Sequence, residues 1–307
     1  MNYDKIISTM KVGFMAPFYP VPDTVKPEDK AEWLFKRSNE LNCKTIDYCL
    51  PFEDTDDDVS SLKSLMDRYD IEPDMRVPRS FFTLADGGAE AAQARKELVA
   101  RCKSMHKLGL HILRAGYGRN TIPTSRFSTD VKGQDQLKKL EKTLSTAAEI
   151  LESEDIYFAL ENHCDFTAQQ FVEVFEAVDS PYIGCALDTG NGIIIFNDPN
   201  VEYKLLAPYV ITTHIKDMTA MADPEKDHVP FMACNALMGE GIVDIEDAIE
   251  TVARKSKHGR GLHLIVETGT TGAWAPQFAG MPDDERIALS KTWYDTYIAK
   301  LLKFIDR

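Results

Sequence analysis

The chain has 307 residues, of which 44% are hydrophobic and 27% are charged, an ordinary composition for a globular protein. A chain of this size can bury a full core without disulfides or structural metals, and its composition excludes a largely disordered state. Lysine and arginine number 35 against 49 aspartate and glutamate residues, a net charge of −14. A net-acidic surface repels nucleic acid and anionic lipid.

No apolar run approaches the roughly 20 residues that a membrane span needs. The N-terminus also lacks the basic start and long apolar stretch of a secretory signal. The 6 cysteines include no Cys-x-x-Cys pair and need not form a disulfide framework. We therefore expect a cytoplasmic protein with mostly reduced cysteines, and neither nucleic acid nor membrane as a partner.

Short β-branched runs alternate with long amphipathic stretches along the chain. The runs predicted as strands are, in chain order, 12–15, 45–50, 74–79, 111–115, 157–161, 183–188, 210–215 and 263–267. Each is followed by a segment with helical periodicity, and these segments are 27–41, 59–69, 90–108, 134–151, 167–178, 202–206, 244–254 and 284–304. Pro27 suits a helix start and Gly109 a helix stop.

Strict alternation of strands and helices implies parallel strands with helical crossovers. About eight such units match the size of a closed (β/α)8 TIM barrel. An open doubly wound sheet would be favoured by a glycine-rich turn after the first strand, but residues 16–20 read APFYP. Stretches 118–128, 218–241 and 268–282 are predicted as loops. No linker divides the chain, so we predict an α/β protein whose single TIM-barrel domain spans residues 1–307.

The last four predicted strands end at side chains that can bind a metal, namely Glu161, Asp188, His214 and Glu267. The carboxyl ends of barrel strands meet at one rim, where barrel enzymes carry their catalytic residues. Each residue alone is more often a helix cap, an ion-pair partner or a core histidine. Three uncompensated carboxylates gathered at one rim would repel one another, which favours a shared divalent cation.

Oxygen-rich ligands with one imidazole suit Mn²⁺, Mg²⁺, Co²⁺ or Fe²⁺ better than a structural zinc site. We expect one such ion, with Mn²⁺ first among these. Four protein ligands leave positions open in an octahedral shell, so a substrate can chelate the metal.

The motifs LENH (160–163), LDTGN (187–191), THIKD (213–217) and IVETG (265–269) resemble those of the xylose isomerase-like TIM-barrel superfamily. The resemblance is strongest over residues 157–269. It implies a metal held by the four strand-end residues, with Glu161 and Glu267 flanking the substrate and exchanging a proton with it. The superfamily contains sugar isomerases, ketose 3-epimerases, keto-acid isomerases, dehydratases and DNA-repair endonucleases, so the motifs are weakly specific for the reaction.

The chemistry expected of such a site is proton transfer next to a carbonyl. A metal chelated by a sugar carbonyl and its neighbouring hydroxyl acidifies the C–H bond between them. A carboxylate then takes that proton to give an enediolate. Returning the proton to the other face is epimerisation, returning it to the neighbouring carbon is isomerisation, and losing a substituent is elimination. We expect an isomerase or epimerase acting on a keto sugar.

Two positions depart from the ketose 3-epimerases, which usually carry a histidine where this chain has Asn191 and an arginine where it has Ala220. His163 lies two residues beyond Glu161 and faces the same side if the strand continues. We predict it as an additional acid or base, or as a hydrogen-bonding group only. The Asn-His pair after the glutamate also resembles the catalytic subunits of C-glycoside deglycosidases. The alternative function is therefore a lyase that eliminates the aglycone of a 3-keto glycoside, or a dehydratase.

Lys216, Asn191 and Arg114 are predicted to bind the substrate. Lys216 would stabilise an oxyanion, unless it is a solvated surface lysine. Arg79 and Arg114 end their predicted strands, where they would bind hydroxyls or a carboxylate, or form ion pairs at the rim. We expect a homo-oligomer, with a second, different subunit as the alternative. A DNA-repair phosphodiesterase is disfavoured because only His163 and His214 lie near the right rim.

Overall fold

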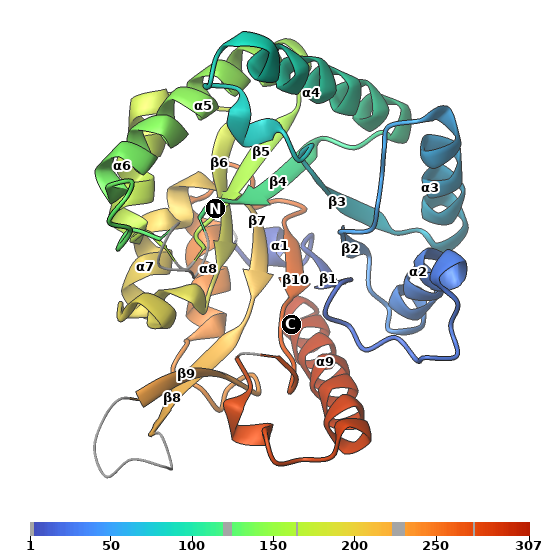
Figure 1. Ribbon diagram of the computed structural model, residues 1–307. Helices are drawn as coiled ribbons and strands as arrows, with labels where there is room; N and C mark the ends of the chain where they lie inside the picture. Colours follow the sequence, from blue (N-terminus) through green and yellow to red (C-terminus); the bar gives the residue numbers. More distant parts are fainter. Residues whose placement is uncertain (1–2, 119–124, 164, 223–230, 273) are drawn as a thin grey trace.

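The computed structural model describes residues 3–118, 125–163, 165–222, 231–272 and 274–307. A parallel sheet closes on itself in the order β1-β10-β7-β6-β5-β4-β3-β2, which confirms the predicted (β/α)8 TIM barrel (Figure 1). The barrel strands are β1 (Lys11–Met15), β2 (Thr45–Tyr48), β3 (Glu72–Arg76), β4 (Ile112–Gly116), β5 (Tyr157–Glu161), β6 (Ile183–Asp188), β7 (Val210–Ile215) and β10 (His263–Val266).

One α-helix of the outer ring follows each barrel strand (Figure 1). These helices are α2 (Lys30–Glu40), α3 (Asp56–Tyr69), α4 (Gly88–Leu108), α5 (Gly133–Ser153), α6 (Ala168–Val178), α7 (Pro199–Leu206), α8 (Ile245–Lys255) and α9 (Asp283–Ile305), and the single turn α1 (Asp4–Ile7) precedes β1. Within the described ranges, no helix is both long and apolar enough to cross a membrane.

Local sequence signals explain where several of these helices begin and end. Thr55 and Thr167 each form a capping box with the residue three positions on, at the start of α3 and α6. Helix α4 ends, as predicted, at Gly109, whose φ of 74° is readily adopted by a residue without a Cβ. Helix α7 begins at Pro199 rather than at residue 202, because the Asp198 side chain caps it.

Some predicted strand ends differ from the observed ones. Strand β3 runs from Glu72 to Arg76 instead of 74–79. Its earlier end agrees with Pro78, which cannot donate a ladder hydrogen bond. Arg79 consequently lies beyond the strand, just before the 3-10 helix η2 (Phe81–Thr83). Strands β2 and β10 end two residues and one residue earlier than predicted, at Tyr48 and Val266.

The stretch 218–241, predicted as a loop, contains most of an antiparallel hairpin. Strand β8 (Asp217–Ala222) pairs with β9 (Phe231–Ala236), and the hairpin projects away from the barrel (Figure 1). The segments read DMTAMA and FMACNA, which hold few of the β-branched residues that mark a strand. The predicted loop 118–128 includes residues 119–124, which lie outside the described residues, as do residues 223–230 between the two hairpin strands.

A polar layer lies inside the barrel toward the amino ends of its strands. His263 Nδ1 on β10 lies 2.6 Å from Asp74 Oδ1 on β3, and both side chains are buried. Thr212 on β7 donates a hydrogen bond to the other oxygen of Asp74. Burial by itself lowers the pKa of His263, but Asp74 and Glu72 outweigh that effect and raise it to about 9. A structural role for His263 agrees with its place at the start of the strand.

Candidate metal centre

Glu161, Asp188, His214 and Glu267 lie side by side because their strands are neighbours in the barrel, in the order β10-β7-β6-β5. Asp188 is the register partner of His214 across β6 and β7. Glu161 ends β5, and Glu267 is the first residue after β10. Glu161, Asp188 and His214 are buried, and 14% of the Glu267 side chain is exposed.

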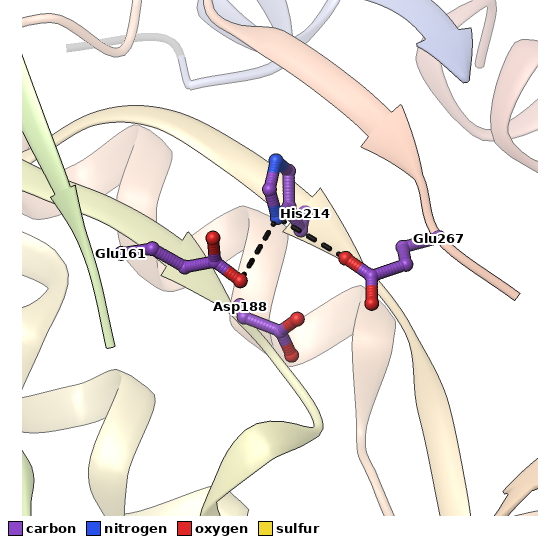
Figure 2. A group of neighbouring side chains, drawn as sticks. All are labelled: Glu161, Asp188, His214 and Glu267. Atoms are coloured by element: carbon purple, nitrogen blue, oxygen red, sulfur yellow. Dashed lines mark ion pairs between the residues drawn. The ribbon is translucent and has the colours of Figure 1, made fainter. Parts of the chain in front are cut away.

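One ligand atom from each of these four residues lies within 4.8 Å of the other three, and Figure 2 shows the side chains gathered around a common space. His214 Nδ1 is 3.3 Å from Glu161 Oε1 and 3.2 Å from Glu267 Oε2. This nitrogen is buried and makes no hydrogen bond to any described residue. A buried nitrogen facing carboxylate oxygens, with no hydrogen bond of its own, fits a divalent cation.

Asp47 of β2 supports His214 from the other side of the imidazole and was not among the predicted residues. Its Oδ2 lies 3.2 Å from His214 Nε2, and the same oxygen forms an ion pair with Arg114 of β4. A carboxylate behind a metal-binding histidine fixes the ring orientation and its tautomer. The available signal was an aspartate inside the predicted strand 45–50, since a charged side chain in a buried strand needs a partner.

Lys216 lies within the carboxylate cluster and is only 2% exposed, so the alternative of a solvated surface lysine is wrong. Its Nζ is 2.9 Å from Asp188 Oδ2 and 3.0 Å from Glu267 Oε1. It also donates a hydrogen bond to Asn191 Oδ1 at 3.0 Å, and Asn191 Nδ2 donates to Glu161 Oε1 at 3.5 Å. Lys216 and Asn191, two of the three predicted substrate-binding residues, therefore contact the proposed metal ligands.

Arg114 is buried and forms ion pairs. Ion pairing at the rim is the alternative to binding substrate hydroxyls or a carboxylate. Besides its pair with Asp47, its guanidinium Nη1 lies 3.7 Å from Glu161 Oε2. The sequence led us to expect uncompensated carboxylates at this rim. The structure instead pairs them with Lys216 and Arg114. The sequence could not show this because the ion pairs join side chains from different strands and strand ends.

Burial and neighbouring charges shift the pKa values of the cluster residues in different directions. Burial raises the pKa of Asp188 to about 6, although Lys216 opposes the shift. Burial acts in the same direction on Glu267, but Lys216 and His214 outweigh it and lower that pKa to about 2. For His214, burial is outweighed by Glu161, and the pKa lies well above its ordinary value. A cation that binds at Nδ1 must therefore displace a proton.

His163 follows Glu161 out of β5, and about a third of its side chain is exposed. Its Nδ1 lies 3.8 Å from Asp165 Oδ2. Burial lowers the pKa of His163, but Asp165 and Glu161 outweigh it and the pKa is raised. A proton-transfer role and a hydrogen-bonding role both stay open for this histidine.

A pocket of about 1010 Å³ opens beside the cluster, at the upper end of the range for small-molecule sites. Glu161, His163 and Arg114 line it next to the candidate metal centre. Arg76 and Arg79 line it from β3 and the segment after that strand. The pocket therefore connects the carboxylate cluster with a basic wall.

Residues 35–296 match the family model described as xylose isomerase-like TIM barrel. The chain belongs to this family. The match confirms the resemblance of the four strand-end motifs to the superfamily. The ligand roles of the strand-end residues remain predictions for this member of the xylose isomerase-like TIM barrel family.

A curated relative is the 3-oxo-isoapionate decarboxylase of Pectobacterium atrosepticum, 31% identical over 142 residues. The match covers 46% of this chain and 47% of that protein, so the chain spans about half the length of the curated relative it matches. Part of this family member thus resembles a 3-oxo-isoapionate decarboxylase.

Two solved structures share the fold over nearly the whole chain. An L-ribulose 3-epimerase superposes with a TM-score of 0.66 at 17% identity, over 97% of this chain and 96% of that one. A xylose isomerase-like TIM barrel protein from Mycobacterium smegmatis, in complex with magnesium, gives 0.64 at 12% identity, over 97% and 99%. At such identities the likeness concerns the fold alone.

Proposed function

We propose that the chain is a divalent-metal-dependent enzyme that removes a proton next to the carbonyl of a keto sugar, as an isomerase or epimerase. The observation that carries the proposal is the convergence of Glu161, Asp188, His214 and Glu267 within 4.8 Å. Their donor atoms fit one divalent cation, for which Mn²⁺ is the first choice and Mg²⁺, Co²⁺ and Fe²⁺ are the alternatives. When bound, the cation would polarise the substrate carbonyl as a Lewis acid.

Glu161 and Glu267 are the proposed proton-exchanging groups. They approach the same nitrogen of His214 from two sides (Figure 2), so a substrate placed between them would meet one carboxylate on each face. One carboxylate would take the proton and the other would return it, as epimerisation requires. Lys216 lies beside Glu267, where its charge would stabilise a negative charge developing on the substrate oxygen. His163 is a further proposed acid or base.

A lyase is the second candidate, and the partial identity with the decarboxylase supports it. In decarboxylation of a 3-oxo acid, the electron pair of the broken C–C bond passes toward the carbonyl as CO₂ leaves. The resulting enolate then takes up a proton. The same Lewis acid and the same cationic Lys216 would stabilise that enolate, so the cluster suits both reactions.

The proposal is tested first by the metal content of the protein purified without chelator. We expect about one divalent ion per chain in the wild type, and much less in Glu267→Gln. Glu240→Gln is the matched control, because Glu240 is exposed and lies outside the cluster. A wild-type protein that cannot be loaded with any of the four ions would refute the proposal.

The loaded enzyme is then incubated with keto sugars and keto sugar acids in deuterated water. Deuterium at the carbon next to the carbonyl of recovered or isomeric sugar would support the isomerase or epimerase. Release of CO₂, or formation of an unsaturated product, would support the lyase instead.

A further inference from the structure

Arg76 and Arg79 form the basic wall of the pocket. We propose that Arg76 and Arg79 bind an anionic group of the substrate, a carboxylate or a phosphate, so that the substrate is an acidic keto sugar. The placement of its carbonyl end at the carboxylate cluster rests on the proposed function. The anion site itself does not, because it involves none of the proposed metal ligands.

The barrel register places the arginines at a useful distance from the cluster. Arg76 of β3 is the partner of Arg114 on β4, and Gly116, two residues further along β4, is the partner of Glu161 on β5. Neighbouring strands lie about 4.8 Å apart, so two strand spacings, about 10 Å, separate the backbones of β3 and β5. A sugar acid of several carbons, together with an extended arginine side chain, bridges that distance.

The charges of the pocket leave these two arginines available. Both are exposed and line the pocket, and the structure shows no ion pair or side-chain hydrogen bond between either guanidinium and another described residue. The remaining cations are engaged, since Arg114 pairs with carboxylates of the cluster and Lys139 pairs with Asp86. Two guanidinium groups offer the planar, forked donors that match a carboxylate or a phosphate.

Among the described residues, the carboxylates that line this pocket are Asp135 and Glu161, and Glu53, Asp54 and Glu97 line an adjoining pocket with the same arginines. Asp135 lines the pocket from the exposed face of α5, and Glu161 belongs to the carboxylate cluster. Arg76 and Arg79 attract an anionic group, which orients an acidic sugar with its anionic end at these arginines. In a chain of net charge −14, this wall is a local exception.

The backbone between the two ends leaves room for a substrate. At Gly116, an added Cβ would lie 3.5 Å from Glu161 Oε2 and 3.6 Å from the Cδ2 of His163. Gly116 lines the pocket, so a larger side chain at this position would take up part of its volume. Glycine keeps the passage open.

The test compares D-gluconate with D-glucitol, which share a carbon skeleton and differ in whether C1 is a carboxylate. Calorimetric titration of the protein as purified should show at least about tenfold tighter binding of gluconate. The ratio of the affinity for gluconate to the affinity for glucitol should fall to about one in Arg76→Gln/Arg79→Gln. The preference should persist in the control Arg95→Gln/Arg260→Gln, which removes two exposed arginines outside the pocket. Ribose 5-phosphate against ribose, titrated in parallel, shows whether the site favours phosphate over carboxylate.

Equal binding of gluconate and glucitol by the wild type would overturn the inference, as would a lack of gluconate binding at millimolar concentration. A preference that survives in Arg76→Gln/Arg79→Gln but disappears in Glu267→Gln would place the anion at the cluster and also overturn it. Wild-type protein that takes up no divalent ion yet keeps an arginine-dependent preference would refute the proposed function and leave the anion site standing.

Discussion

Asp47 provides a sharp test of the candidate metal centre, because it touches His214 but is not a proposed ligand. Its Oδ2 is 3.2 Å from His214 Nε2, whereas the two glutamates contact the other ring nitrogen, Nδ1. Asp47→Asn keeps an oxygen that can accept the Nε2 hydrogen but removes the charge. Loss of such a supporting carboxylate weakens metal binding about 10- to 100-fold, which is about 1.4 to 2.7 kcal/mol.

The measurement is the dissociation constant for Mn²⁺ by calorimetry, with unfolding followed in parallel. Asp74→Asn is the matched control, since Asp74 is also a buried strand aspartate paired with a buried histidine, His263. We expect the control to lose stability and to keep its metal affinity. Unchanged affinity in Asp47→Asn, or an equal loss in both variants, would contradict the role of Asp47 as a support for His214.

Three further predictions concern other parts of the barrel. The pKa of His263 is raised to about 9, so the stability that its charged form contributes is full below the unfolded pKa of about 6.5 and is lost as pH rises through 9. Denaturant titrations should show this loss of unfolding free energy, and the pH dependence should disappear in His263→Asn. In Gly13→Ala, the new Cβ would lie 2.1 Å from the backbone oxygen of Thr45, so the free energy of unfolding should fall by about 2 kcal/mol or more, whereas Gly280→Ala, which meets nothing within 4 Å, should change it little. Lys216→Met removes the cation between two carboxylates, so added Mn²⁺ should raise its melting temperature more than that of the wild type; an equal or smaller rise would contradict this role.

The barrel and the convergence of Glu161, Asp188, His214 and Glu267 could be predicted because both follow from order along the chain. Alternating periodicities specify parallel strands and crossover helices, and the last residues of successive strands meet at one rim. A displacement of one or two residues at a strand end, as at β10, did not matter because Glu267 still lies at that rim.

Contacts across the barrel could not be predicted in this way. Asp47 and His214 come from β2 and β7, which are not neighbours in the sheet, and they meet only because the barrel closes. The hairpin of β8 and β9 was missed for another reason, since its strands carry little of the β-branched pattern on which strand prediction depends.

The charge balance of the cluster explains why a divalent cation suits it. Four carboxylates, including Asp47, face the cations Lys216 and Arg114 and the protonated His214, so one negative charge is left over when Asp188 is ionised. A divalent cation that displaces the His214 proton adds one net positive charge and brings the cluster to neutrality. A monovalent ion would leave the deficit unchanged. The neutral cluster would then carry no excess negative charge to repel an anionic intermediate of the proposed reaction.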